Sequence, residues 1–188
     1  MVTLIVYFPY RRIAVVGSTG SGKTTLAAEL AARLDIPHIE LDALYWQPDW
    51  VEVEWEEMRM QVDKLTRAPA WVTDGNYNFC RDLIWERAEA VIWLDLPLAV
   101  CLWRLWRRTW RRIFSREPLW GTNVERFWPQ FFSRDSIFYW ALRTYSQRRK
   151  HYTALFASGM YPHLALYRFK SQQEVEEWRR AWGGERGA

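Results

Sequence analysis

The stretch from Gly17 to Thr24 has the residue types and the spacing of a phosphate-binding loop. It reads Gly-Ser-Thr-Gly-Ser-Gly-Lys-Thr, which matches G-x-x-x-x-G-K-[ST] at every fixed position. Glycines let the backbone curl until successive N–H groups point at phosphate oxygens, and the N-terminal end of the following helix adds positive charge. In such a loop Lys23 reaches the β- and γ-phosphates of ATP, and the Thr24 hydroxyl ligates Mg²⁺. We therefore expect ATP and Mg²⁺ as cofactors, held by Gly17, Ser18, Thr19, Gly20, Ser21, Gly22, Lys23, Thr24 and Thr25.

Three aspartates stand where apolar runs end, which is where chemistry is placed in parallel sheets. Phosphoryl transfer uses an acid beside the Mg²⁺ ion, and Asp74 and Asp95 are both candidates. Turn chemistry is the alternative for each, because Asp74 precedes a glycine and Asp95 precedes Leu-Pro. Asp42 could accept a proton from a substrate hydroxyl, and a helix N-cap or turn is its alternative.

The residues 98–112 form a predicted helix with two different stripes. At 100° per residue the stripes consist of Trp103, Trp106 and Trp110 on one side and Arg104, Arg108 and Arg111 on the other. We expect the tryptophans to pack inward and the arginines to face a groove. There the arginines would neutralise charge on a transferring phosphoryl group. A solvated basic face is the alternative.

Two further arginines, Arg134 and Arg143, lie beyond an irregular stretch at 113–131. An excursion flanked by arginine-bearing helices is typical of a closing lid, which we place at 111–135. Ordinary surface arginines are the alternative.

Positive charge is concentrated in the middle of the chain. Residues 101–150 carry a net charge of +9, whereas the whole chain carries +4. Such asymmetry indicates an anionic partner. Nucleic acid is one reading, but no recognised nucleic-acid motif accompanies the basic segment.

Strand-like and helical segments alternate along the chain. Strands are predicted at 12–16, 38–41, 71–73, 90–94 and 164–169, and helices at 24–34, 52–67, 98–112 and 134–152. Ser171 and Glu174 fit a capping box that starts a last helix. This alternation predicts an α/β fold, with a parallel sheet covered on both faces, in one domain over 1–188. Residues 1–11 are read as an extra edge strand or as an extension.

Composition narrows the class of protein. No apolar run approaches the roughly 18 residues of a membrane helix, and the opening residues lack a basic leader and a cleavage site. Cys80 and Cys101 form no disulfide or zinc motif. We therefore expect a cytoplasmic protein that is a monomer or a homodimer and has no membrane partner.

The ordered motifs resemble the adenylate-kinase-like branch of P-loop kinases and, within it, the family of DNA topology modulation proteins. The resemblance covers roughly residues 12–180. It is carried by 17–24, Ile-Glu-Leu-Asp-Ala-Leu-Tyr-Trp (39–46), Trp-Val-Thr-Asp-Gly-Asn-Tyr (71–77), Arg-Asp-Leu-Ile-Trp (81–85), Val-Ile-Trp-Leu-Asp-Leu-Pro (91–97), Trp-Arg-Leu-Trp-Arg-Arg (103–108) and Ser-Arg-Asp-Ser-Ile (133–137).

This resemblance implies a five-stranded parallel sheet in the order 2-3-1-4-5 with a helical lid after the fourth strand. It implies that Asp74 is the metal-side acid. It also implies that Arg104 and Arg108 lie at the nucleotide site and lid, and that Arg134 and Arg143 lie near the helix that returns from the lid.

The sequence departs from adenylate kinases where those enzymes hold a monophosphate acceptor. They carry an arginine soon after the acid of the second strand and Phe-Pro-Arg after the Asp-Gly of the third. Here the stretches are Asp-Ala-Leu-Tyr (42–45) and Asn-Tyr-Asn (76–78), which argues against AMP. The Asp-Ala-Leu stretch is similar to kinases of small hydroxylated metabolites, such as gluconate kinases, where an aspartate meets the acceptor hydroxyl. The resulting substrate candidates are Asp42, Trp46, Asp74, Asn76 and Arg81, with Tyr45 and Tyr77 completing an aromatic wall for stacking or sugar binding.

Two hypotheses follow. The first is an ATP-binding kinase that transfers the γ-phosphoryl group of Mg-ATP to a nucleotide, nucleoside or hydroxylated metabolite. Its predicted catalytic residues are Lys23, Asp42, Arg104, Arg108, Arg134 and Arg143, with Thr24 and Asp74 at the metal. The second is an ATP-binding regulator of DNA topology or gene expression that has no kinase acceptor.

Overall fold

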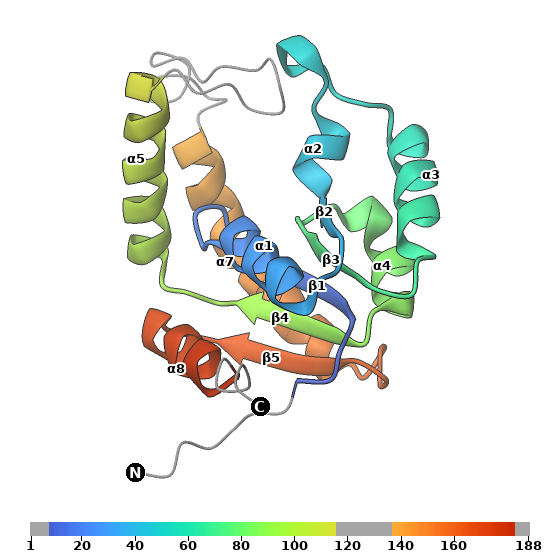
Figure 1. Cartoon of the computed structure of the whole chain (residues 1–188). Coiled ribbons are helices and arrows are strands. Elements are labelled where there is room, and N and C mark those ends of the chain that lie inside the picture. Colours follow the sequence, from blue (N-terminus) through green and yellow to red (C-terminus); the bar gives the residue numbers. More distant parts are fainter. Residues whose placement is uncertain (1–7, 116–136, 183–188) are drawn as a thin grey trace.

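Five short apolar segments pair as the parallel strands of one sheet (Figure 1). These are β1 (Arg12–Gly17), β2 (His38–Glu40), β3 (Trp71–Asp74), β4 (Ala90–Leu94) and β5 (Ala165–Phe169), in the order β2-β3-β1-β4-β5. The predicted sheet and its order are thus confirmed. The register pairs Val15 with Asp74 and Gly17 with Leu94, so the carboxyl ends of the three central strands meet at one edge. In sheets of this kind, that edge is where ligands bind.

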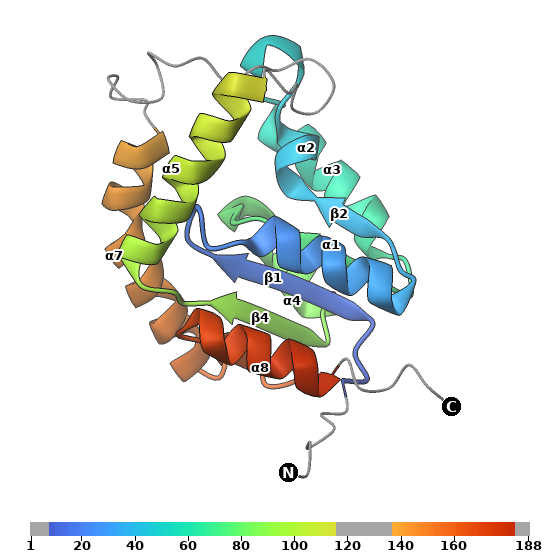
Figure 2. The same ribbon diagram turned by 60° about the vertical axis from the view of Figure 1, so that its left-hand side comes forward.

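The computed structural model describes residues 8–115 and 137–182, and within these the sheet has a helical layer on each face. Because side chains of a strand alternate, Ile13 and Val15 pack into one core while Ala14 and Val16 pack into the other. Figure 2 shows α1 and α8 crossing one face. The helices are α1 (Lys23–Leu34) and α8 (Gln172–Trp182) on that face, and α3 (Trp55–Thr66), α4 (Arg81–Arg87) and α7 (Ile137–Ala157) on the other.

Strand β4 shows why the sheet forms from this sequence. All five of its residues, Ala-Val-Ile-Trp-Leu, are buried, as expected for a strand covered on both faces. Burying each large apolar side chain contributes about 1.5–3 kcal/mol. The continuous apolar run predicted both the strand and its bounds.

The second strand is shorter than predicted. It ends at Glu40, and the chain turns directly into the short helix α2 (Leu41–Tyr45). Asp42 therefore lies in the first turn of a helix instead of at a strand end. Two 3-10 turns complete the excursions beside the sheet, η1 (Pro48–Trp50) and η2 (Asn78–Cys80).

The expected orientation of the tryptophan stripe is wrong. In α5 (Leu98–Ser115) the buried stripe is Cys101, Leu105 and Thr109. Trp103 is 56% exposed and Trp106 is 42% exposed, and their rings stack on each other with centroids 5.1 Å apart. The helix packs closely against the phosphate-binding loop, because Gly20 lies against the backbone of Cys101 and the side chain of Leu105. This close contact leaves the larger tryptophan rings on the outer side of the helix.

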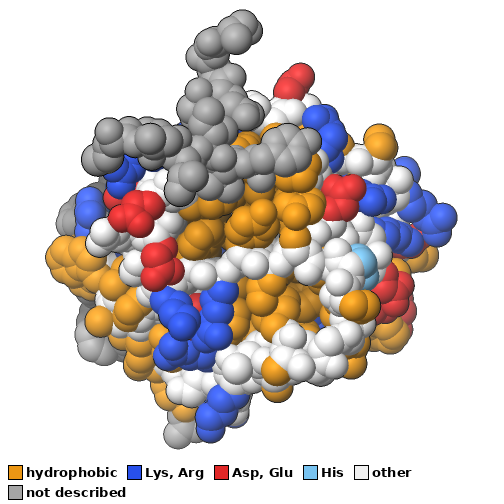
Figure 3. Space-filling model, turned by 90° about the horizontal axis from the view of Figure 1, so that it is seen from below, with side chains coloured by type: hydrophobic (Ala, Val, Ile, Leu, Met, Phe, Trp, Pro, Cys, Tyr) orange, Lys and Arg blue, Asp and Glu red, His pale blue; other side chains and the backbone are white. Residues whose placement is uncertain are grey.

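The edge formed by β5 and α8 holds a second group of aromatic rings. Phe8 is 5% exposed and packs against Tyr167, Trp178 and Trp182. Figure 3 shows the molecule from below, with hydrophobic side chains gathered across this face between charged ones. Residues 8–11 form no strand; Phe8 packs into the core while Pro9 and Arg11 are exposed, so the described part of the N-terminal extension is not an edge strand.

The capping box at the start of α8 is present in a slightly altered form. The Glu174 N–H donates to the Ser171 hydroxyl at 3.1 Å, while the Glu174 carboxylate accepts from the Lys170 N–H at 2.7 Å. Most of the predicted lid, including Arg134, lies outside the described residues. Among the described helices, none combines the length and apolar character needed to cross a membrane.

Candidate active site

The loop between β1 and α1 is a tight turn that only glycine can build at key points. Gly20 has φ +79°, and a Cβ there would lie 2.3 Å from the Cys101 carbonyl oxygen. The Ser21 N–H donates to the Ser18 carbonyl at 3.1 Å, which closes the turn. Lys23 folds back over the loop, and its Nζ donates to the same carbonyl at 3.2 Å. The loop thus brings backbone N–H groups, an amine and a helix N-terminus to one point.

Asp74 and Thr24 meet directly at the end of β3. The Thr24 hydroxyl donates to Asp74 Oδ2 at 2.6 Å, and Asp74 is 2% exposed. A hydroxyl and a carboxylate side by side are oxygen ligands suited to Mg²⁺. The other carboxylate oxygen, Oδ1, lies 2.7 Å from His38 Nε2.

His38 is a residue that the sequence reasoning missed. It begins β2 and pairs in register with Val72, two residues before Asp74. From there its ring reaches the carboxylate and fixes the orientation of that group. The only sequence signal was a histidine at the start of a buried strand.

Asn76 ties the start of the loop to the segment after β3. Its side-chain N–H donates to the Gly17 carbonyl at 2.7 Å, and its Oδ1 accepts from the Gly17 N–H at 3.3 Å. The Tyr152 hydroxyl donates to the same Oδ1 at 3.0 Å. The side chain of Asn76, which was predicted to bind substrate, therefore uses these hydrogen bonds to hold the phosphate-binding loop in place.

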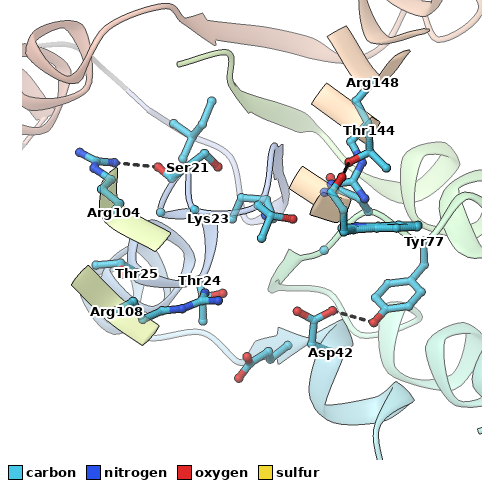
Figure 4. Close-up of a pocket in the computed structure, with 18 of the residues that line it drawn as sticks. Ser21, Lys23, Thr24, Thr25, Asp42, Tyr77, Arg104, Arg108, Thr144 and Arg148 are labelled. Atoms are coloured by element: carbon cyan, nitrogen blue, oxygen red, sulfur yellow. Dashed lines mark hydrogen bonds between the residues drawn. The ribbon is translucent and has the colours of Figure 1, made fainter. Parts of the chain in front are cut away.

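Asp42 is held by Tyr77. The Tyr77 hydroxyl donates to Asp42 Oδ1 at 2.6 Å. Burial, and then the Asp42 charge, raise the pKa of Tyr77 far above its ordinary value, so the phenol remains a donor. One oxygen of the Asp42 carboxylate is thus fixed by Tyr77, and Figure 4 shows the group facing the space around Lys23.

Lys23, Thr24, Asp42, Asn76 and Tyr77 line one cleft of about 2290 Å³, whereas Asp74 lies behind Thr24 and is not among the lining residues. This volume exceeds the roughly 300–1,000 Å³ of a typical small-molecule site, so the cleft has room for two ligands side by side. Lys23 lies in the middle of it, with Arg104 and Arg108 on one side and Asp42 and Tyr77 on the other (Figure 4).

The cleft has two walls of opposite character. We call the lining residues of the phosphate-binding loop, α1, α5, α7 and α8 the phosphate wall, and those of segments 40–52 and 75–79 the acceptor wall. The phosphate wall presents Lys23, Arg104, Arg107, Arg108, Arg111, Arg112, Arg143, Arg148 and Arg179. The acceptor wall presents the carboxylates Glu40, Asp42, Asp49 and Glu52 and the rings Tyr45, Trp46, Trp50, Tyr77 and Phe79.

The arginines of α5 face the cleft, as the sequence analysis predicted for this stripe. Arg104 anchors the loop, because its Nη1 donates to the Ser21 carbonyl at 2.9 Å and its Nη2 donates to Gln172. Arg108 faces the side of the loop where Thr24 lies (Figure 4). Arg143 also lines the cleft, from α7.

Arg148 is the second residue that sequence reasoning missed. It reaches the cleft from α7, and its guanidinium has no carboxylate partner in the described ranges 8–115 and 137–182. Burial lowers the pKa of Arg148 from its ordinary value, opposed by Tyr152 and Asp42. A guanidinium keeps its charge in proteins even when it is buried, so Arg148 remains a cation.

The amine of Lys23 lies close enough to charged side chains from both sides of the cleft for them to affect its pKa. Burial lowers the pKa of the Lys23 amine, and the charges of Arg148 and Arg108 lower it further, against the opposing effect of Asp42 and Asp74. An amine with two guanidinium neighbours and a desolvated position favours a polyanion between them.

Two predicted candidates lie away from this point. Arg81 does not line the cleft; it contacts His151 and Asn78 and lies over the Trp85 ring. Asp95 is buried in ion pairs with Arg149 at 3.1 Å and Arg168 at 2.6 Å. Of the two candidate metal acids, only Asp74 touches the loop.

Comparisons with known proteins show the fold of this chain. No family model matches the chain. The "Uncharacterized protein YqaC" of Bacillus subtilis (strain 168) is 30% identical over 118 residues, which is 62% of this chain and 66% of that protein. The match therefore spans slightly less than two thirds of the length of that relative.

Two solved structures superpose over most of the chain. A shikimate kinase from Bacteroides thetaiotaomicron has a TM-score of 0.53 at 17% identity and covers 93% of this chain and 95% of its own. A gluconokinase from Sinorhizobium meliloti 1021 has a TM-score of 0.52 at 18% identity, with 93% and 90% covered. The chain has the P-loop kinase fold. The comparisons support this fold, but they do not support membership of the DNA topology modulation family that the motifs resemble.

Proposed function

We propose that this protein is a Mg-ATP-dependent phosphotransferase that moves the γ-phosphoryl group to a hydroxyl of a small molecule. The observation that carries the proposal is that the carboxylate of Asp42 faces the amine of Lys23 across one cleft. A fixed carboxylate opposite a phosphate-binding lysine is the arrangement that an in-line transfer to a hydroxyl requires. Two proteins with this fold are kinases by name, which agrees with the proposal.

Binding of the nucleotide uses the phosphate wall. The loop N–H groups and Lys23 take the β- and γ-phosphates, and Arg104 holds the loop in shape through its bond to Ser21. Thr24 and Asp74 are the residues that would hold Mg²⁺, which neutralises charge on the phosphate oxygens when bound. These residues fit a metal-bound triphosphate, because a hydroxyl and a carboxylate suit Mg²⁺ while N–H groups and an amine suit phosphate oxygens.

Transfer uses groups from both walls. The acceptor oxygen bonds to the γ-phosphorus as the bond from that phosphorus to the β–γ bridging oxygen breaks, and ADP leaves. Asp42, held by Tyr77, orients the hydroxyl and takes its proton. Arg108 and Arg148 flank Lys23 and stabilise the charge of the phosphoryl group in flight. The role predicted for Arg134 remains a prediction, because that residue lies outside the described part of the chain.

The test is ADP release from Mg-ATP by the purified protein, measured with pools of nucleosides, nucleotides and hydroxylated metabolites. We expect one pool to raise turnover well above the rate with water alone. Lys23→Ala should abolish that gain, whereas the matched variant Lys64→Ala, on the exposed face of α3, should keep it. Gain that survives Lys23→Ala would contradict the proposal.

A second variant separates acceptor chemistry from nucleotide binding. Asp42→Asn should keep ATP binding and lower acceptor-dependent turnover by about 10²–10⁴-fold, the range for a general base. Binding of ATP with no acceptor-dependent turnover from any pool would favour the regulator hypothesis instead. The structure lends that hypothesis no separate surface in α5, because five arginines of this helix line the cleft.

A further inference from the structure

The two walls of the cleft differ in the charges of their side chains. Among its described residues there is no lysine and no arginine, and its ionisable side chains are carboxylates and tyrosines. The phosphate wall is the reverse, since its described residues include no carboxylate. The two sets of side chains therefore differ in charge, and Arg148 of α7 is a cation that lies on the same side of Lys23 as Tyr77 (Figure 4).

The acceptor wall is also a continuous aromatic surface. The Tyr45 ring lies 5.0 Å from both the Trp46 ring and the Tyr77 ring, and Trp46 lies 5.7 Å from Trp50, centroid to centroid. Ring faces of this kind stack on the apolar faces of sugar-like rings and attract cations. Trp50 is 37% exposed, so this surface continues to the mouth of the cleft.

Carboxylates frame this aromatic surface. Burial, and then a hydrogen bond to Glu52, raise the pKa of Tyr45 to about 12. Glu52 and Asp49 are exposed at the rim, and Asp42 lies deeper beside Tyr77. An acceptor that carried a phosphate or carboxylate would meet like charge at the rim and at the base of the wall, which opposes its binding.

Arg148 does not make the acceptor wall a site for anions. Its charge acts on Lys23 and also on Asp42 and Tyr77, and Figure 4 shows it between Lys23 and the side of the cleft that carries Tyr77, so it lies where the two walls meet. That boundary is where the γ-phosphoryl group passes, and the phosphoryl group is the anion that Arg148 neutralises.

We propose that the acceptor is a hydroxylated ring compound without phosphate or carboxylate groups, and that amine-bearing rings are preferred over neutral ones. This inference rests on the proposed kinase function and names the substrate class of the same site. It excludes nucleoside monophosphates, sugar phosphates and sugar acids as the physiological acceptors.

The experiment sorts defined acceptors by charge. Three pools are compared for ADP release from Mg-ATP: hexoses, inositol and nucleosides; amino sugars and aminocyclitols; sugar acids, sugar phosphates and nucleoside monophosphates. We expect turnover with the amine-bearing or neutral pool at least tenfold above that with the anionic pool. Highest turnover with the anionic pool overturns the inference and leaves the kinase function standing. No gain with any pool overturns the kinase function, and this inference with it.

Variants of the acceptor wall test whether the wall makes the choice. Asp49→Asn with Glu52→Gln should reduce the preference for amine-bearing over neutral acceptors several-fold, without changing the affinity for ATP. Trp50→Ala should raise the KM for the acceptor by about 5–30-fold while kcat is kept, the loss expected for a stacked or cation-facing ring. Trp103→Ala, an exposed tryptophan that does not line the cleft, is the matched control. Unchanged selectivity in all acceptor-wall variants would overturn the inference.

Discussion

Asp74 and Asp95 lie at the carboxyl ends of the two strands that flank β1, yet their surroundings differ. Asp74 is the last residue of β3 and Asp95 directly follows β4, and they are 2% and 5% exposed. Asp95 is held by two guanidinium groups, from Arg149 and Arg168. Asp74 accepts from the Thr24 hydroxyl and lies beside His38.

This difference separates a structural carboxylate from one that is available for a metal. The two arginines bond to Asp95 and so connect α7 and β5 to the end of β4. The charge of Asp95 is therefore balanced by protein side chains within the fold. Within residues 8–115 and 137–182, Asp74 has no guanidinium partner, and its charge is left for a cation at the loop. Burial and position alone do not distinguish the two; the charge of the partners does.

Asp95→Asn should give the largest loss of stability. Removing the charge weakens the ion pairs to two partly exposed arginines, which costs about 1.5–3 kcal/mol. For a chain of this size, this lowers the Tm by roughly 3–12 °C. Thermal unfolding followed by circular dichroism measures it. If kcat per folded molecule fell instead, Asp95 would belong to the site and the comparison would fail.

Asp74→Asn should affect turnover and leave stability nearly unchanged. Asparagine still accepts from Thr24, but it is a poor Mg²⁺ ligand, so Mg-ATP turnover should fall by about 10²–10³-fold, as for loss of a charge-stabilising group. The matched control is Asp35→Asn, at an exposed helix end. A large loss of Tm with normal turnover would reverse the roles assigned to the two aspartates.

The two arginines of the Asp95 cluster should contribute unequally. Arg168 makes two bonds to Asp95 Oδ2, at 3.1 and 2.6 Å, and its guanidinium lies 4.2 Å from the centroid of the Trp93 ring. Arg149 is 49% exposed, so its pair is screened by water. Chemical denaturation should give a loss of about 2 kcal/mol for Arg168→Met and less than about 1 kcal/mol for Arg149→Met. Equal losses would show that exposure does not set the strength of these pairs.

His38→Asn should have the smallest effect on the reaction. Losing the group that orients a metal-side carboxylate weakens metal binding by about tenfold. A titration of Mg²⁺ at fixed ATP, followed by turnover, should therefore shift its midpoint upward. His163→Asn is the matched control, because His163 bonds the Trp85 carbonyl outside the cleft. An unchanged midpoint would mean that Thr24 alone orients Asp74.

Local patterns predicted the loop and the strands, whereas contacts between distant segments escaped the sequence. The phosphate-binding loop is specified by consecutive residues, and an apolar run such as β4 defines its own bounds. The order of the strands came from the resemblance to P-loop kinases. Periodicity separated the tryptophan and arginine stripes of α5, but the stripe that faces inward is a third one, Cys101, Leu105 and Thr109. That outcome depends on how closely Gly20 approaches Cys101, which the spacing of residues does not show.

The missed residues share one cause. His38 and Arg148 gain their roles only when β2 and α7 are brought against the loop, and no spacing in the chain encodes that approach. Asp42 and Arg104, which were predicted because both lie beside recognisable motifs, line the cleft. Arg81 also lies in such a motif, yet it turns away to Trp85.

The side chain of Asn76 extends the sheet beyond its backbone. The ladder between β1 and β3 ends at Val15 and Asp74, and two residues later the amide of Asn76 offers Gly17 a donor and an acceptor, as a further strand residue would. The first residue of the loop is therefore also the last rung of the sheet. In hydrogen–deuterium exchange, the amide hydrogen of Gly17 should persist with those of the core strands, so protection should stop inside the phosphate-binding motif and not at its edge.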